Sequence, residues 1–242
     1  MLWSLWFWFL AGIGTGIWLP LMAITRVVTA PWDRAHYWTG YLFRKLPVVA
    51  CSLTPPWDFS VSGAIPKDPR RPYVVVANHE SFVDILLLSH LPFEMKWLSK
   101  VEMFKIPVFG WLMRLAHDVP LERGDRGSAS TAMDACADRL RKKVSVMIFP
   151  EGTRATGDEL LPFKDGAFRL ALETRTPILP IAVHGTRTAL QKHSWKLGES
   201  HARAVVLEPE PVDGLGPDDV EVLKKRVRTR IEEALEKLKV SL

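Results

Sequence analysis

The chain has 242 residues, of which 48% are hydrophobic and 24% charged, with 18 Pro and 15 Gly. This composition is that of an ordinary globular protein with one or two domains, and it excludes collagen-like, low-complexity and wholly disordered chains. The formal net charge of +5 favours an acidic partner, which could be nucleic acid, anionic lipid or a phosphorylated small molecule.

The first part of the chain differs from the rest in polarity. Residues 1–24 form an apolar run about as long as a helix that crosses a hydrocarbon core. The first 25 residues carry no charged side chain, and seven of the ten tryptophans lie within the first 57 residues. A cleavable signal peptide fits poorly because the first positive charge, Arg26, follows the apolar run. We therefore expect the start of the chain to associate with a membrane.

A second aromatic and aliphatic stretch covers residues 37–53 and contains Arg44 and Lys45. Because a position at the middle of a bilayer would be costly for these two cations, we expect this segment to lie in the headgroup layer. The pattern fits a spanning helix followed by an interfacial helix, or a helical hairpin that enters one leaflet and returns. A buried hairpin of a soluble protein is less favoured. The excess of basic residues between positions 26 and 53 favours anionic headgroups and the cytoplasmic side.

From about residue 54, short β-branched runs alternate with segments of helical period, which predicts an α/β domain with a largely buried sheet. The sequence thus predicts membrane-binding helices over 1–53 and an α/β domain over 54–242. Strands are expected over 73–77, 95–99, 117–121, 144–149, 178–183 and 202–207. Helices are expected over 82–90, 107–114, 128–143, 166–173 and 218–240. A basic stretch in the last of these begins at Lys224 and is typical of a solvated face, with membrane or partner contact as the alternative.

The first expected strand is followed by the polar sequence NHESFVD at residues 78–84. The carboxyl end of a strand is where α/β sheets place their sites. His79 and Asp84 cannot share one face of a continuous helix, but they can meet if His79 lies in the turn and Asp84 begins the helix. His79 would then be a general base whose ring Asp84 orients. The alternative is that His79 is only a turn residue and that Ser81 and Asp84 form a helix-capping box.

A second polar cluster, FPEGTR at residues 149–154, follows the expected strand 144–149. The carboxylate of Glu151 could accept a hydrogen bond from a substrate hydroxyl, and the guanidinium of Arg154 matches a phosphate. The alternative is a surface turn with an exposed ion pair. Two further segments, around Lys105 and Arg123, could each be an ordinary basic loop.

The order NHESFVD, KIPVFGW, LERGDR, FPEGTR and PILPIAV over residues 78–183 resembles the glycerophospholipid acyltransferase family, and within it the bacterial 1-acyl-glycerol-3-phosphate acyltransferases. The resemblance implies an α/β fold in which a mixed β-sheet flanked by helices follows a membrane-associated helical segment. It implies that His79 is the catalytic base and Asp84 its orienting partner. The substrate-binding residues that it implies are Glu151, Gly152, Thr153, Arg154, Arg123, Lys105 and Ser81. The chain departs from the family pattern at Asp165, where a second basic residue is common, and at Ala155, where a polar residue is common.

The same resemblance implies transfer of an acyl chain to the free sn-2 hydroxyl of 1-acyl-sn-glycerol 3-phosphate at the cytoplasmic membrane. The donor would be acyl-CoA or acyl carrier protein, with no cofactor and no metal. Histidines 79, 90 and 117 lack the spacing of metal ligands. Nucleic acid becomes the least expected acidic partner. The alternatives left open are another acceptor (glycerol 3-phosphate, a lyso-ornithine lipid or another lysophospholipid), a His–Asp hydrolase, and a non-catalytic lipid-binding module.

Overall fold

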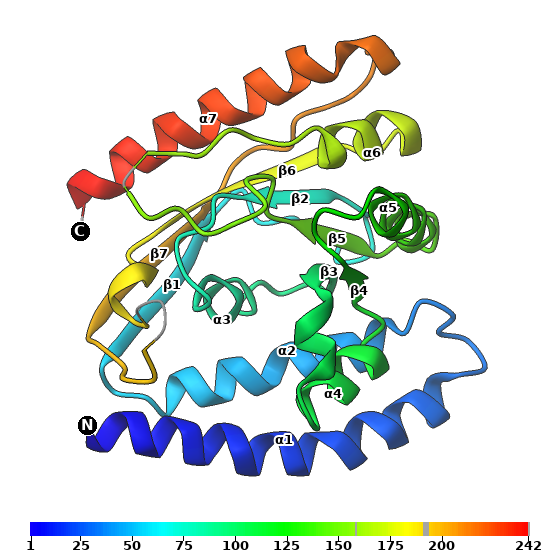
Figure 1. Ribbon diagram of the computed structural model, residues 1–242. Coiled ribbons are helices and arrows are strands. Elements are labelled where there is room, and N and C mark those ends of the chain that lie inside the picture. The colour runs from blue at the N-terminus through cyan, green and yellow to red at the C-terminus, as the bar shows by residue number, and fades with distance from the viewer. Residues whose placement is uncertain (158, 191–193, 242) are drawn as a thin grey trace.

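A computed structural model describes residues 1–157, 159–190 and 194–241 (Figure 1). Within these residues seven strands form one sheet with the order β1-β7-β6-β2-β5-β3-β4. The strands are β1 (Trp57–Gly63), β2 (Val74–Ala77), β3 (Met95–Lys100), β4 (Val119–Leu121), β5 (Ser145–Ile148), β6 (Ile178–His184) and β7 (Ser200–Val206). The helices are α1 (Leu2–Thr29), α2 (Tyr37–Ser52), α3 (Asp84–Leu88), α4 (Phe109–Leu115), α5 (Arg126–Arg141), α6 (Gly166–Thr174) and α7 (Val220–Ser241).

The sheet is mixed, as the sequence predicts. Strands β2, β3, β4, β5 and β6 run parallel to one another, whereas β7 is antiparallel to β6 and parallel to β1. The carboxyl ends of the five parallel strands therefore meet at one edge of the sheet, together with the amino ends of β7 and β1. The strand β1 was not predicted from the sequence; it is an edge strand in which polar residues separate Trp57, Phe59 and Val61.

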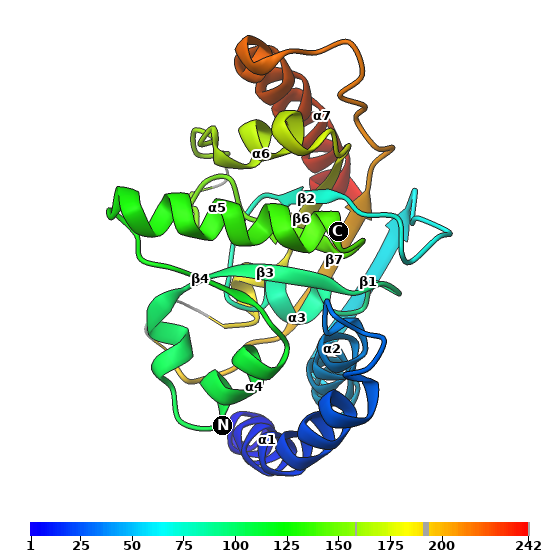
Figure 2. The ribbon, with the colours of Figure 1, turned by 90° about the vertical axis from the view of Figure 1, so that its right-hand side faces the viewer.

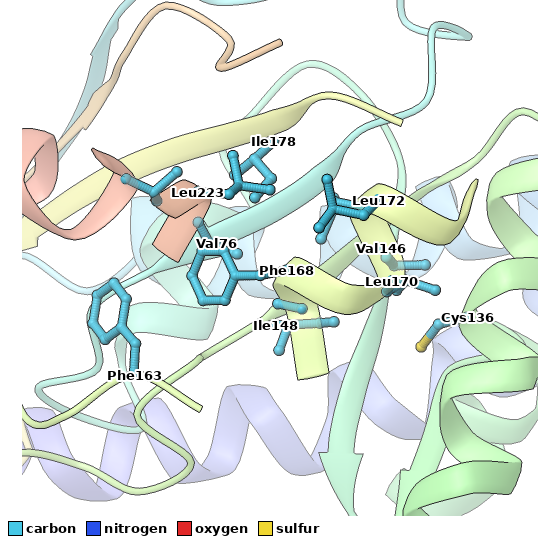
Figure 3. Close-up of a cluster of buried hydrophobic side chains, with 14 of the residues drawn as sticks. Val76, Cys136, Val146, Ile148, Phe163, Phe168, Leu170, Leu172, Ile178 and Leu223 are labelled. Atoms are coloured by element: carbon cyan, nitrogen blue, oxygen red, sulfur yellow. The ribbon is translucent and has the colours of Figure 1, made fainter. Parts of the chain in front are cut away.

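Helices cover both faces of the sheet (Figures 1 and 2). Helices α5, α6 and α7 lie on one face, where Phe168 packs with Val76 and Ile148 (Figure 3). Alternate residues of β2, Val75 and Ala77, face the other side and pack in the cluster that includes residues of α3. Burial on both faces explains why the central strands are continuous apolar runs in the sequence.

The first two helices form an antiparallel pair on the side of the sheet opposite α7 (Figure 1). Among the described residues, α1 is the one helix long and apolar enough to cross a membrane, and only 11% of its most apolar window is buried. Gly14 allows the two helices to approach closely, because a Cβ there would lie 2.6 Å from Leu46 Cδ1. The indole of Trp18 also donates a hydrogen bond to the Leu42 carbonyl of α2 (2.8 Å).

Both ends of α1 contact the α/β part of the chain. Near its start, Ser4 Oγ accepts a hydrogen bond from Leu197 N (3.0 Å), and near its end the Arg26 guanidinium donates to the Leu115 carbonyl (3.1 Å). A helix that projected away from the α/β part to span a bilayer would lose one of these contacts. The structure therefore fits a hairpin lying along the α/β part better than a perpendicular spanning helix followed by an interfacial one.

Two features of the charged residues bear on the sequence predictions. The expectation that Arg44 faces lipid headgroups is wrong, because its guanidinium is buried against Asp118 and Glu94 on the sheet side of α2. Most of the basic residues in the stretch of α7 that begins at Lys224 form ion pairs with carboxylates of the same chain. Lys224 pairs with Asp165 (2.8 Å), and other residues of the stretch pair with Glu210 and Glu232.

Candidate active site

The polar residues singled out by the sequence lie after the carboxyl ends of neighbouring strands. His79 follows β2, Glu151 follows β5 and Arg123 follows β4, while Lys105 closes the 3-10 turn Val101–Lys105 after β3. Adjacent strands are about 4.8 Å apart, so the turns after β2 and β5 are direct neighbours. The topology therefore gathers the predicted site residues at one edge of the sheet.

His79 and Asp84 form a direct pair at this edge. His79 Nδ1 lies 2.7 Å from Asp84 Oδ2. Asp84 is fully buried as the first residue of α3, whereas the His79 side chain is 11% exposed from the turn before it. A carboxylate at this position accepts a hydrogen bond from Nδ1–H, which leaves the lone pair of the neutral ring on Nε2. The histidine can therefore accept a proton at Nε2.

Other hydrogen bonds fix the Asp84 carboxylate in place. Its Oδ2 also accepts from the backbone N–H groups of Glu80 (2.8 Å) and Ser81 (3.0 Å), and its Oδ1 accepts from the hydroxyl of Thr186. The Ser81 N–H bond is the one that the carboxylate of a capping box would accept, but the N-cap of α3 is Val83 and no side chain caps this helix. The capping box offered as the alternative is therefore not formed, whereas Oδ2 pairs with His79.

His79 is also held by the turn that follows β5. Its ring stacks on Phe149, with the ring centroids 3.9 Å apart, and its backbone N–H donates to Glu151 Oε1 (2.8 Å). The other oxygen of Glu151 accepts from Leu161 N (3.0 Å), and burial raises the pKa of this carboxyl. The sequence suggested that Glu151 accepts from a substrate hydroxyl. In the structure both of its oxygens instead bind backbone N–H groups.

The loop between β5 and α6 carries two cations. Gly152 has φ +70°, and a Cβ there would lie 2.7 Å from Lys164 Nζ, so a glycine is needed for the turn and for the close approach of Lys164. Arg154 is half-buried and makes no ion pair within the described residues. Thr153 is exposed beside it. Arg154 and Lys164 are thus available to an anionic ligand.

Arg123 and Lys105 are exposed at the same edge and form no ion pair in the part of the chain that the structure describes. Among the described residues, neither side chain is hydrogen-bonded to His79 or Asp84. Ser81 is buried, and its hydroxyl donates to the Leu190 carbonyl (3.2 Å), so its contacts are within the protein. Across the described residues, no three His, Cys, Asp or Glu side chains are placed to hold a metal ion.

Two residues that were not predicted from the sequence join the His79 turn to the end of β6. One is Thr186, through its bond to Asp84. The other is Glu80, whose carboxylate accepts from Gly185 N (3.1 Å) and lies 3.0 Å from His184 Nδ1. A signal was present, because polar residues directly follow the expected strand 178–183 at the edge where the other site residues lie.

Comparison with known proteins supports the implied family and fold. A model of the Acyltransferase family matches residues 58–184. The chain is 32% identical over 227 residues to the chloroplastic 1-acyl-sn-glycerol-3-phosphate acyltransferase BAT2 of Brassica napus, covering 93% of this chain and 64% of that protein. It is 37% identical over 170 residues to human 1-acyl-sn-glycerol-3-phosphate acyltransferase alpha, covering 69% of this chain and 60% of that protein.

The chain thus spans somewhat less than two thirds of the length of these relatives. Among solved structures, it is similar to the 1-acyl-sn-glycerophosphate acyltransferase PlsC of Thermotoga maritima, with a TM-score of 0.83 and 28% identity. That match covers 98% of this chain and 95% of the other. The predicted fold is therefore confirmed: an apolar N-terminal helix is followed along the chain by a mixed sheet flanked by helices.

Proposed function

The chain belongs to the acyltransferase family, and on this premise we propose that it transfers an acyl chain from an acyl thioester to the free sn-2 hydroxyl of 1-acyl-sn-glycerol 3-phosphate. The product would be phosphatidic acid, an intermediate of phospholipid biosynthesis. The names of its relatives support this acceptor. The observation that carries the proposal is the His79–Asp84 pair, which offers a general base at the sheet edge next to an apolar helix.

The proposed chemistry uses the substrate hydroxyl as the nucleophile. His79 Nε2 takes the hydroxyl proton while the oxygen attacks the thioester carbonyl and forms a tetrahedral intermediate. The C–S bond then breaks, and the imidazolium returns the proton to the departing thiolate. Asp84, whose Oδ2 lies 2.7 Å from Nδ1, stabilises the imidazolium between these two steps. The protein itself forms no covalent intermediate in this scheme.

The site is well placed for an acceptor with one acyl chain in a membrane. Phe7 of α1 packs in the same apolar cluster as Val83, which lies between His79 and Asp84 in sequence. An acceptor held in the leaflet beside α1 would therefore reach the His79 turn without leaving the membrane surface. Arg154 and Lys164 would bind its phosphate, with Arg123 and Lys105 further along the same edge.

We assign residues 1–53 to membrane binding and 54–242 to catalysis. Because both ends of α1 contact the α/β part, the two helices would enter one leaflet with the catalytic domain on the same side. Acyl-CoA and acyl carrier protein are water-soluble donors of the cytoplasm, so we place this side on the cytoplasmic face of the membrane. No cofactor is needed in this scheme, in which the thioester is a co-substrate.

The decisive experiment supplies labelled acyl-CoA or acyl carrier protein thioester to the purified chain with a panel of hydroxyl acceptors. Phosphatidic acid should form from lysophosphatidic acid, and little free acid should appear without an acceptor. His79→Ala should abolish transfer and still bind vesicles, and Arg154→Ala should raise the KM of the acceptor more than that of the thioester. Free acid released without an acceptor would indicate a hydrolase, and near-normal transfer by His79→Ala would rule out the mechanism.

A further inference from the structure

Residues 195 and 197 lie against the first turns of α1, outside the two N-terminal helices. We propose that the short segment 194–197, through the indole of Trp195, binds the membrane surface beside the start of α1. The proposal rests on the membrane contact of α1 that the proposed function includes, and it adds a second contact, about 190 residues away in the chain.

The segment is fixed to the first turns of α1 by two hydrogen bonds. Leu197 N donates to Ser4 Oγ (3.0 Å), and the Ser4 side chain is buried. The indole Nε1 of Trp8 donates to the Trp195 carbonyl (2.8 Å). The backbone at Trp195 is therefore held at the level of the first two turns of α1, so a surface that embeds those turns lies close to residue 195.

The side chains of the segment suit the boundary between lipid and water. Trp195 is 46% exposed although its backbone is fixed, and three exposed tryptophans, Trp3, Trp6 and Trp8, lie on the first turns of α1. Tryptophan prefers the headgroup level of a bilayer, where one part of the ring is apolar and the other is wet. The next residue, Lys196, is exposed and would favour an anionic headgroup. One isolated exposed indole would need no explanation, whereas its continuity with the α1 surface points to lipid.

The same segment reaches the turn that carries His79. Leu190 and Leu197 form an antiparallel bridge, and Gly198 N donates to the Ala189 carbonyl (3.0 Å). The Leu190 carbonyl in turn accepts from the hydroxyl of Ser81 (3.2 Å). Trp195 is thus joined to the His79 turn by one short series of contacts. A lipid bound at Trp195 would lie where an acceptor moves from the leaflet toward His79.

The chain allows a specific labelling test. Its native thiols, Cys51 and Cys136, are buried, and burial raises the pKa of each to about 12, so neither should react with a thiol reagent at neutral pH. A fluorophore can therefore be placed at position 195 alone in Trp195→Cys. Val222→Cys is the matched control, because Val222 is exposed to a similar extent (44%) on α7, across the sheet from α1 (Figure 1).

The labelled full-length chains are reconstituted into vesicles of phosphatidylcholine and phosphatidylglycerol whose acyl chains are partly brominated. The proposal expects strong quenching of the fluorophore at position 195 and little at position 222. Equal quenching at the two positions, or none at 195, would overturn it. The measurement requires no turnover, so it decides the lipid contact even if the acyl-transfer assay contradicts the proposed function.

A second measurement uses the activity with unlabelled variants. Trp195→Ala should raise the apparent KM for lysophosphatidic acid presented in vesicles by roughly tenfold. This is the effect expected when about half of the indole surface is no longer buried in lipid. The KM for a short-chain, water-soluble acceptor should stay unchanged, and Trp195→Phe should recover most of the loss. An equal rise in KM for both acceptors would show that Trp195 shapes the site itself and would overturn the assignment to lipid.

Discussion

Two clusters of buried carboxylates in this protein differ in what their oxygens bind. Around Asp84, the oxygens accept hydrogen bonds from backbone N–H groups, one hydroxyl and the ring of His79. In the second cluster, the carboxylates of Glu94 and Asp118 form ion pairs with two fixed cations, Arg44 and Lys96. Among the described residues no fixed cation balances the Asp84 carboxylate, so it can stabilise a charge that appears on His79 during a reaction. In the second cluster the charges are already balanced.

The second cluster connects the helical pair to the sheet. Arg44 of α2 binds Asp118, whose Oδ1 also accepts from the backbone N–H of Trp97 in β3 (3.0 Å). Lys96 Nζ donates to Glu94 Oε1 (2.9 Å) and to the His36 carbonyl in the turn between α1 and α2 (2.8 Å). Buried charge therefore serves two purposes in this fold: one cluster orients a reactive ring and the other joins α2 to β3.

The largest expected effect concerns the carboxylate beside His79. Asp84→Asn should lower kcat about 10³-fold, because a neutral amide cannot stabilise the imidazolium and can donate to Nδ1, which selects the wrong tautomer. The variant should fold and bind vesicles, since an amide oxygen still accepts from the backbone N–H of Glu80 or Ser81. Steady-state kinetics and vesicle sedimentation measure the two properties separately.

The double variant tests whether His79 and Asp84 act as a unit. His79→Ala combined with Asp84→Asn should be no slower than His79→Ala alone, because the carboxylate has no role without the ring. A kcat for Asp84→Asn within tenfold of the wild type would contradict the difference drawn between the two clusters.

The second effect concerns the balanced cluster. Arg44→Ala should lower the free energy of unfolding by about 3 kcal/mol, because it leaves Asp118 buried without its cation. We expect the lower end of the range for such pairs, since the backbone N–H of Trp97 still binds Asp118. Guanidinium unfolding in a mild detergent measures the loss, and kcat of the folded protein should change little.

Lys45 provides the matched control for Arg44. It is the next residue of α2, it is only partly buried, and its ammonium lies over the ring of Tyr41 (4.5 Å) rather than in an ion pair. Lys45→Ala should change the free energy of unfolding by no more than about 0.5 kcal/mol. Equal losses for Arg44→Ala and Lys45→Ala would show that the buried cluster does not join α2 to the sheet.

The sequence could predict features that depend on short segments. The polar turn that contains His79 and the polar turn that contains Arg154 each follow an apolar strand. A parallel sheet brings the carboxyl ends of such strands together. The sequence could not predict that the Arg44 side chain points toward the sheet. Its partner Asp118 is 74 residues away, and only the packing of α2 on β3 brings the two together. The hydrogen bonds of Glu151 also depend on tertiary structure, because its partners include a backbone N–H 72 residues away.

The third effect concerns pH and the edge of the balanced cluster. The rings of His36 and His117 meet edge to face, with centroids 4.6 Å apart, and burial next to cations lowers their pKa to about 4 and about 3. The unfolded chain therefore binds more protons than the folded one between these values and about pH 6.5. Stability should therefore fall as the pH is lowered from 6.5 toward 4.

A double substitution isolates the contribution of this pair. Asparagine suits both positions, because His36 and His117 have φ of 52° and 66°, and it does not titrate. The variant His36→Asn/His117→Asn should lose less stability between pH 7.5 and pH 5 than the wild type, as measured by denaturant midpoints. An unchanged pH dependence in the double variant would assign the loss of stability to other groups.

The smallest effect concerns the one side-chain hydroxyl on the Asp84 carboxylate. Thr186→Val removes the donor to Oδ1 and keeps the shape of the side chain. Since Oδ2 keeps both backbone donors, Asp84 should remain in place but rotate more freely. We expect kcat to fall about tenfold, the effect of one lost hydrogen bond to a charged group. The KM of both substrates should stay unchanged, and Thr186→Ser should recover most of the activity.

Thr188 separates this positioning role from a general effect on the turn Thr186–Thr188. Its hydroxyl donates to the Gly185 carbonyl (3.2 Å) in the same turn, and its side chain is exposed. If Thr188→Val lowers kcat as much as Thr186→Val does, the loss comes from a disturbed turn. If only Thr186→Val lowers kcat and serine restores it, the hydroxyl orients Asp84. The Asp84 cluster would then depend on the direction of each bond, whereas the Arg44 cluster depends on balanced charge.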